Sequence, residues 1–119
     1  MILGDLPRED LFRRLAGLGL VVRMGPFQVR IHSRIPAFCR QFAELYRYHT
    51  LGDCARFIDF DIEMATRRSW NRRTAVFKFN GDDPLIPLPI DQAMPLFEWG
   101  LNWCIVSLAH RFVMVDRKS

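Results

Sequence analysis

The sequence predicts a single α+β domain: a mainly antiparallel sheet packed with about three helices, the last of them largely buried. Three observations lead to this fold class. Two stretches repeat apolar residues at helical spacing, shorter stretches alternate apolar and polar residues, and one late stretch is apolar on nearly all sides. The 119 residues contain no repeat or linker-like segment, so residues 1–119 are expected to form one domain.

The first expected element is an N-terminal helix. Its apolar residues share one helical face: Leu11, Phe12, Leu15 and Leu18. Asp5 can cap this helix, and Pro7 falls in its first turn, where the missing N–H does no harm. Gly17 and Gly19 supply the signal that ends it.

Two strands and a second helix are expected next. Leu20–Met24 and Phe27–His32 have strand patterns, and the Gly25–Pro26 pair between them is a turn signal. In the second strand apolar and polar residues alternate, which places one face in the core and the other in water. Ala37–Tyr48 is predicted to be a helix because its apolar residues recur at helical spacing.

The clearest strand signal in the chain is Phe57–Met64. A polar, basic turn over Arg67–Arg73 and a second strand over Thr74–Asn80 complete a predicted antiparallel hairpin. Three acidic residues share the polar face of the first strand: Asp59, Asp61 and Glu63. They could bind a divalent cation, or they could form the solvated face of the sheet and pair with arginines across the hairpin.

The remainder of the chain predicts one helix between two extended segments. Prolines at positions 84, 87 and 89 restrict Leu85–Ile90 to an edge strand or a loop. Asp91 is expected to cap the last helix, which is apolar on nearly all sides over Met94–Ala109 and is therefore expected to be buried by several neighbours. Phe112–Val115 is predicted to form a short final strand.

We predict no catalytic, cofactor-binding or metal-ligating residue in this chain. The phosphate-binding patterns GxxxxGK[ST] and GxGxxG and the metal-binding pattern HExxH do not occur. Cys39, Cys54 and Cys104 are odd in number and too far apart for a CxxC pair, which indicates a reducing compartment. Charges interrupt the first twenty residues, and the longest apolar segment is too short to cross a bilayer, so we expect a cytoplasmic protein without membrane insertion.

Arginines surround one tryptophan in the predicted basic turn: Arg67, Arg68, Arg72 and Arg73 lie around Trp70. With a net charge of +4, they are candidates for binding an anion, either phosphate or nucleic acid, and the alternative is a solvated surface. Basic residues are spread along the chain and only Trp70 is interleaved with this group, so nucleic acid is the less favoured partner.

Two polar residues, Glu98 and Asn102, lie one turn apart on the apolar last helix. Buried polar groups need hydrogen-bond partners, so these two could form a bonded pair inside the core. Alternatively, they could belong to a surface that docks another domain, with Trp99 and Trp103 as its anchors. Glu98, Trp99, Asn102 and Trp103 are therefore the candidate interface.

Three stretches resemble a known family: Gly25–Phe27 with the alternating strand through Ile31, then Pro87–Ala93, and above all Phe97–Cys104. Over nearly its whole length the chain is similar to the N-terminal part of the HPr kinase-related kinase A proteins, which occur in bacteria alongside exosortase systems. In that family this region precedes an ATP-binding domain with a phosphate-binding loop. The resemblance thus implies ATP and Mg²⁺ only for that kinase domain, which is absent here, and transfers no catalytic residue to this chain.

The resemblance implies a non-catalytic accessory domain of an HPr kinase-like protein. Its partner would be an ATP-binding kinase domain, in cis or in trans, or a second copy of the chain. One alternative is that the chain is a fragment of a full-length ATP-dependent protein serine kinase, either truncated or expressed as a separate domain. A further alternative is a basic nucleic-acid-binding module that uses the four arginines.

Overall fold

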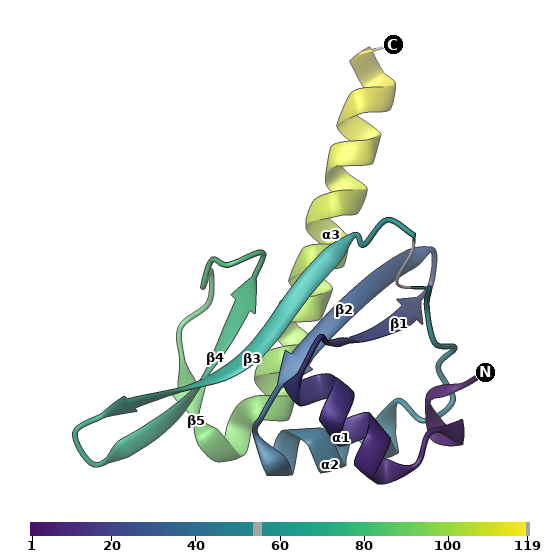
Figure 1. Cartoon of the computed structure of the whole chain (residues 1–119). Coiled ribbons are helices and arrows are strands. Elements are labelled where there is room, and N and C mark those ends of the chain that lie inside the picture. Colours follow the sequence, from purple (N-terminus) through teal and green to yellow (C-terminus); the bar gives the residue numbers. More distant parts are fainter. Residues whose placement is uncertain (54–55, 119) are drawn as a thin grey trace.

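A five-stranded sheet with strand order β1-β2-β3-β4-β5 forms the centre of the chain (Figure 1). The computed structural model describes the backbone of residues 1–53 and 56–118, and their side chains except those of Ser69 and residues 108–118. Every strand pair is antiparallel except β2 with β3, which is parallel. The strands are β1 (Leu20–Met24), β2 (Phe27–Ser33), β3 (Phe60–Ser69), β4 (Arg72–Phe79) and β5 (Leu88–Pro89). The predicted α+β class is therefore confirmed.

Three α-helices pack with this sheet. They are α1 (Arg8–Ala16), α2 (Pro36–Leu45) and α3 (Ala93–Lys118), with single 3-10 turns η1 (Leu3–Asp5) and η2 (Ile90–Gln92). Figure 1 shows α3 running along the sheet while α1 and α2 lie at one end of it. One core cluster joins side chains of all three helices to one face of β1–β4, so the helices and this inner face enclose a single core.

The N-terminal helix differs in detail from its prediction. Asp5 does not cap α1, because its carboxylate accepts a hydrogen bond from the Ile2 N–H at 3.0 Å and closes η1 instead. Pro7 occupies the N-cap position of α1, and the helix ends at Gly17 as expected. Leu18 is 93% exposed, so its predicted place on the apolar face is wrong, because it lies beyond the end of the helix.

The first strand pair and the second helix follow their sequence patterns closely. β1 and β2 form a hairpin around Gly25, whose φ of 60° lies in the left-handed region that favours glycine. Along β2 the alternate residues Val29 and Ile31 are fully buried, as the alternation predicts. α2 ends at Leu45, three residues earlier than predicted.

The second hairpin is longer than its sequence pattern suggests. Most of the predicted turn Arg67–Arg73 belongs to β3 and β4, whose pairing continues to Ser69 opposite Arg72. Only Trp70 and Asn71 form the turn between the strands. The arginines therefore lie on a two-stranded ribbon and not on a loop.

The C-terminal part of the chain is one continuous helix. α3 begins at Ala93, after Asp91 within η2, and runs through Phe112–Val115, so the predicted final strand is wrong. A short apolar run fits a strand or a helix equally well by periodicity, and here the preceding helix simply continues. On α3 the core face carries Leu96, Phe97, Leu101 and Cys104, which confirms that this helix is largely buried.

Phe97 is the centre of the contact between α2 and α3. Its ring lies 5.2 Å from that of Phe38, 5.8 Å from that of Phe42 and 5.9 Å from that of Tyr46, each in an edge-to-face arrangement. Such pairs add to the burial of apolar area. One turn later Gly100 is buried against the ring of Phe77 on β4, so the helix backbone approaches the sheet closely at this point.

Because of the close approach at Gly100, we expect a glycine-to-alanine substitution here to change the stability in the opposite direction from that usual in helices. Glycine to alanine in a helix normally stabilises it by about 1 kcal/mol. At Gly100 the added methyl would overlap the Phe77 ring, and we expect Gly100→Ala to destabilise the protein by about 1–3 kcal/mol. Denaturant unfolding measures the difference, with Asn102→Ala on the exposed side of the same helix as the control. Greater stability of Gly100→Ala would contradict the packing described here.

Candidate functional site

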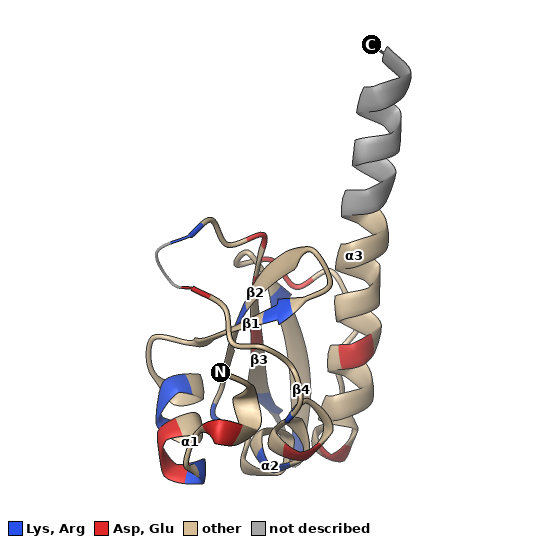
Figure 2. Cartoon of the chain, turned by 90° about the vertical axis from the view of Figure 1, so that its right-hand side faces the viewer, with Lys and Arg blue, Asp and Glu red and all other residues tan. Residues whose placement is uncertain are grey.

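The exposed side of α3 presents a row of residues at helical spacing. Its members, called here the α3 outer face, are Glu98, Trp99, Asn102, Trp103 and Val106. Trp99 is 56% exposed, Trp103 41% and Val106 66%. Figure 2 shows how little charge the described part of α3 carries, and Glu98 is its single charged residue. This face is therefore apolar at its centre and nearly neutral.

The structure decides between the two interpretations of the polar pair on this helix. Glu98 and Asn102 are both exposed, so a hydrogen-bonded pair inside the core is wrong. All four predicted interface residues lie together on the α3 outer face, and Val106, which the sequence analysis left out, extends the row by one turn. Trp103 is held in place by an edge-to-face contact with Phe79 at 5.9 Å between ring centroids.

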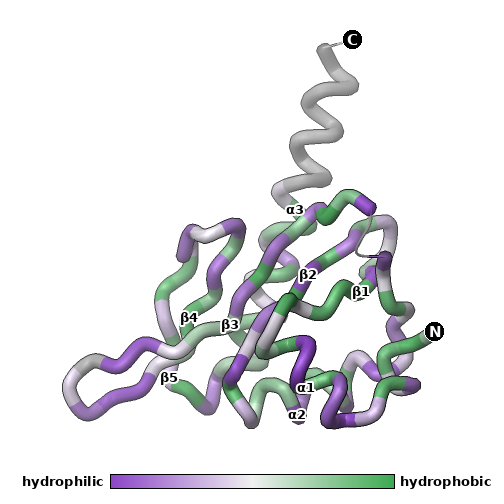
Figure 3. Tube along the Cα trace, viewed as in Figure 1, coloured by the Kyte–Doolittle hydropathy of each residue, from purple (hydrophilic) through white to green (hydrophobic). Residues whose placement is uncertain are grey.

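The arginine group projects from the body of the protein. Arg67, Arg68, Trp70, Arg72 and Arg73 are called here the arginine tip. They lie at the end of the β3–β4 hairpin, which extends away from the rest of the sheet (Figures 1 and 3). The tube in Figure 3 is strongly hydrophilic along this hairpin end. Trp70, at the turn, is 95% exposed.

The strand register sets the positions of the four arginines on the ribbon. Arg68 lies directly opposite Arg73, and like charges in that position repel each other. Arg67 instead donates a hydrogen bond from Nη2 to Oδ2 of Asp83 at 3.0 Å, which lowers the pKa of that carboxyl. In the part of the chain that the structure describes, no carboxylate lies within ion-pair distance of Arg68, Arg72 or Arg73.

The backbone at Trp70 is also unusual. Its φ of 53° is in the left-handed region, which residues other than Gly, Asn and Asp adopt rarely. A non-glycine residue in such a conformation costs about 1–3 kcal/mol. The tip thus keeps a large aromatic side chain where neither burial nor backbone preference favours it.

The predicted acidic row lies on the solvent-facing side of the sheet and is used in local contacts. Asp59 accepts a hydrogen bond from the Gln28 N–H at 2.8 Å. Asp61 pairs with Arg30 at 3.6 Å and with His32 Nε2 at 3.3 Å, both on the parallel neighbour β2. The expected pairing of this row with the arginines of the hairpin tip is wrong, because the parallel register brings β2 residues to Asp61.

The same residues were candidates for a divalent cation site. Among the described residues no group of three or more His, Cys, Asp or Glu side chains is arranged to hold a metal ion. The His32–Asp61–Arg30 cluster was not found in the sequence analysis. In the sequence, Arg30 and His32 only share the polar face of one strand, and Asp61 lies on the polar face of another. The parallel register that brings the two strands together cannot be derived from the pattern of either strand.

A groove of about 940 Å³ lies where the pairing of β2 with β3 ends and β3 continues with β4 as its only neighbour in the sheet. Basic side chains from three parts of the chain line it: Arg34 after β2, Arg40 on α2, and Arg73 and Lys78 on β4. Asp61 and Glu63 also line it. Asp61 is already paired with β2, and Glu63 lies opposite Lys78 in the sheet register. The groove therefore connects the arginine tip to a mainly basic surface.

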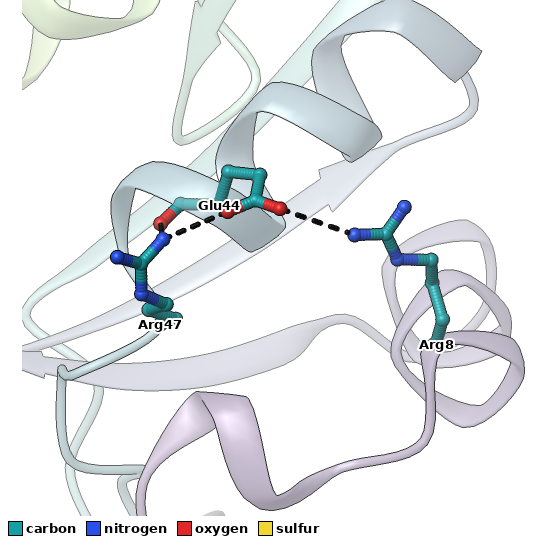
Figure 4. A network of polar contacts seen from close by, with 3 residues as sticks. All are labelled: Arg8, Glu44 and Arg47. Carbon is teal, nitrogen blue, oxygen red and sulfur yellow. Dashed lines mark hydrogen bonds and ion pairs between the residues drawn. The ribbon is translucent and has the colours of Figure 1, made fainter.

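A further polar cluster joins α1 to the end of α2 (Figure 4). Glu44 accepts a hydrogen bond from Arg47 Nη1 at 2.8 Å and pairs with Arg8 at 3.5 Å. Arg47 also donates to the carbonyl oxygen of Glu44 at 3.2 Å. All three side chains are about half exposed, so solvent screens these pairs, and the cluster links two helices without forming a pocket.

The cysteines do not form a reactive site in the described residues. Cys39 and Cys104 are free thiols buried in the core, and burial raises the pKa of Cys104 to about 12. Cys54 lies outside the described residues. No described helix, α3 included, is both long and apolar enough to cross a bilayer.

Comparison of the chain with protein-family models, with curated proteins and with solved structures found no match. The resemblance described above therefore remains a prediction from the residues that carry it. The function is therefore inferred from the α3 outer face, which carries Trp99 and Trp103, and from the arginine tip, which carries Trp70.

Tyr46, at the contact between α2 and α3, is expected to make the folded protein less stable at high pH. Burial, and secondarily the charge of Glu98, raises the pKa of Tyr46 from 10.0 to about 12. In the unfolded chain the phenol ionises near pH 10.0, whereas in the folded protein it stays protonated. The unfolded state then binds fewer protons, and stability falls between these two values.

We expect Tyr46→Phe to make this alkaline decline shallower. Urea unfolding measured at several pH values from below 10.0 up to about 12 tests it. Tyr48→Phe is the matched control, because Tyr48 is 74% exposed. An equal decline in the protein and in Tyr46→Phe would show that Tyr46 is not buried in this junction.

Proposed function

We propose that this chain is a non-catalytic interaction domain that binds a partner domain through the α3 outer face. One observation carries the proposal: Trp99 and Trp103 lie exposed in one row on a helix whose opposite face is core. Tryptophan is highly buried on average in folded proteins, and it is enriched at the centres of protein interfaces. A nearly neutral face with two tryptophans and a valine has the composition of an interface core.

The partner in this proposal is an ATP-binding kinase domain, joined in the same chain or bound from another. The support is the resemblance of Phe97–Cys104 to the HPr kinase-related kinase A proteins, because that segment contains most of the α3 outer face. ATP and Mg²⁺ would then bind to the partner and not to this chain. Free thiols at Cys39 and Cys104 support the cytoplasmic location that is part of the proposal.

The shape of α3 supports docking along the helix. The inner face of the helix is fixed by Phe97 and by the close approach of Gly100 to the sheet, so the outer face is held rigid before a partner arrives. A rigid surface loses less conformational entropy on binding than a flexible one. Self-association through the same face is the alternative outcome that the experiment below distinguishes.

We expect Trp99→Ala to weaken binding of an ATP-binding kinase domain of the HPr kinase-related type by about 2 kcal/mol or more, as at other interface hot spots. Calorimetric titration of the purified domain into the chain measures it. Trp99 is the cleaner site, because Trp103 also contacts Phe79 and its removal would lower stability.

Leu18→Ala is the matched control, since Leu18 is an apolar side chain that is 93% exposed on another part of the surface. It is expected to leave binding unchanged. Equal binding by Trp99→Ala and the parent chain would contradict the proposal. A concentration-dependent dimer that Trp99→Ala converts to a monomer would assign the face to a second copy of the chain instead.

A further inference from the structure

The net positive charge of this chain equals the charge of the four arginines at the arginine tip. The chain has 17 basic and 13 acidic residues, and four of the basic residues lie within residues 67–73, which contain no acid. Without these four, basic and acidic residues are equal in number, so the rest of the chain is formally neutral. The basic residues are spread along the chain, but their excess over acidic residues is local.

The strand register explains why this charge projects. Pairing of β2 with β3 ends at Ser33 opposite Met64, and β5 pairs only with Thr74 and Ala75 of β4. Beyond these points β3 and β4 have only each other as neighbours in the sheet. The ribbon therefore reaches solvent on both faces and along both edges.

Three features of this ribbon point to an anionic ligand with a flat, apolar component. Arg68 and Arg73 face each other and repel, and an anion between them would relieve that repulsion. Trp70 is 95% exposed at the turn beside them. Arg73 also lines the groove of about 940 Å³, in which Lys78, Arg34 and Arg40 continue the basic surface toward α2.

We propose that the arginine tip binds single-stranded nucleic acid, with Trp70 stacked on a base and the arginines contacting the flanking phosphates. A basic groove combined with an exposed aromatic is how proteins bind single strands without sequence preference. Every base has a π-face for Trp70, and the guanidinium groups match phosphate in geometry and charge. Single-stranded RNA and single-stranded DNA share this chemistry.

A lipid surface is the competing anionic ligand, and the tip fits it less well. Binding at a membrane interface depends on buried apolar area as well as on positive charge. Trp70 is the only apolar side chain at the turn, and its sequence neighbours, Ser69 and Asn71, are polar. The arginines are distributed along both strands of the hairpin. This arrangement suits successive phosphates of one nucleic-acid strand better than the flat surface of a membrane.

The test measures binding of fluorescent oligouridylate and oligothymidylate of about a dozen nucleotides to the full chain at several salt concentrations. With about three arginine–phosphate contacts, the logarithm of the affinity should fall against that of the salt concentration with a slope of about −2. Binding of either oligonucleotide supports the proposal, and comparing the two shows which source is preferred. Failure of both to bind at low salt would overturn it.

The decisive variant is Trp70→Gly, because it separates binding from folding. Glycine adopts a φ of 53° without strain, so this variant should be at least as stable as the parent chain. It should nevertheless bind the oligonucleotide about tenfold more weakly, while Trp70→Phe, which keeps an aromatic ring, should retain most of the affinity. Unchanged affinity in Trp70→Gly would overturn the proposal.

The charge is tested by Arg68→Gln combined with Arg73→Gln, which should weaken binding and reduce the salt slope by about 1.4. Arg14→Gln combined with Arg23→Gln changes the net charge equally at exposed positions elsewhere and should have little effect. Equal loss in both double variants would overturn the assignment to the tip. If the chain bound phosphatidylglycerol vesicles through Trp70 but bound neither oligonucleotide, the proposal would also be overturned.

This inference does not depend on the proposed function. Trp99→Ala is expected to leave oligonucleotide binding unchanged, since Trp99 lies on α3 and not on the hairpin. The two proposals can therefore fail separately, and loss of oligonucleotide binding in Trp99→Ala would overturn the assignment to the tip.

Discussion

The contact between α3 and the sheet is the constraint on which the rest of the structure depends. Gly100 lets the helix backbone approach the Phe77 ring on β4, and Phe97 inserts its ring among the aromatic side chains of α2. These two contacts fix the rotation of α3 about its axis. Because Phe97 and Gly100 face the core, Trp99 and Trp103, which lie on the other side of the helix, face outward. The exposed tryptophans are a consequence of how the helix is seated.

Sequence patterns predicted the parts of the fold that depend on neighbours along the chain. Alternation in Phe27–His32 and over Phe60–Met64 within β3 predicted the correct faces, because side chains alternate between the two faces of a strand. The parallel pairing of β2 with β3 was not predicted, because the pattern within a strand does not show which strand lies beside it. That pairing places Arg30 and His32 against Asp61, and it explains why the ion pairs differ from those expected within the hairpin.

The candidate site shows the same division. Trp99 and Trp103 were singled out as the anchors of a possible docking surface on an apolar helix, and both lie at the surface in the structure. Whether Glu98 and Asn102 were core or surface needed the rotation of α3, which only tertiary packing sets. The four arginines were found by their clustering around Trp70 in the sequence. Their position on a projecting ribbon depends on where β2 and β5 stop pairing, and no local pattern shows that.

All three tryptophans of the chain are exposed, on two surfaces of opposite character. Hydroxyl-radical footprinting reads the oxidation of each one separately, and with an ATP-binding kinase domain added it tests the central claim that the α3 outer face binds a partner. The account predicts that Trp99 and Trp103 become protected while Trp70 reacts as before. Unchanged oxidation of Trp99 and Trp103, or protection of Trp70 alone, would contradict it.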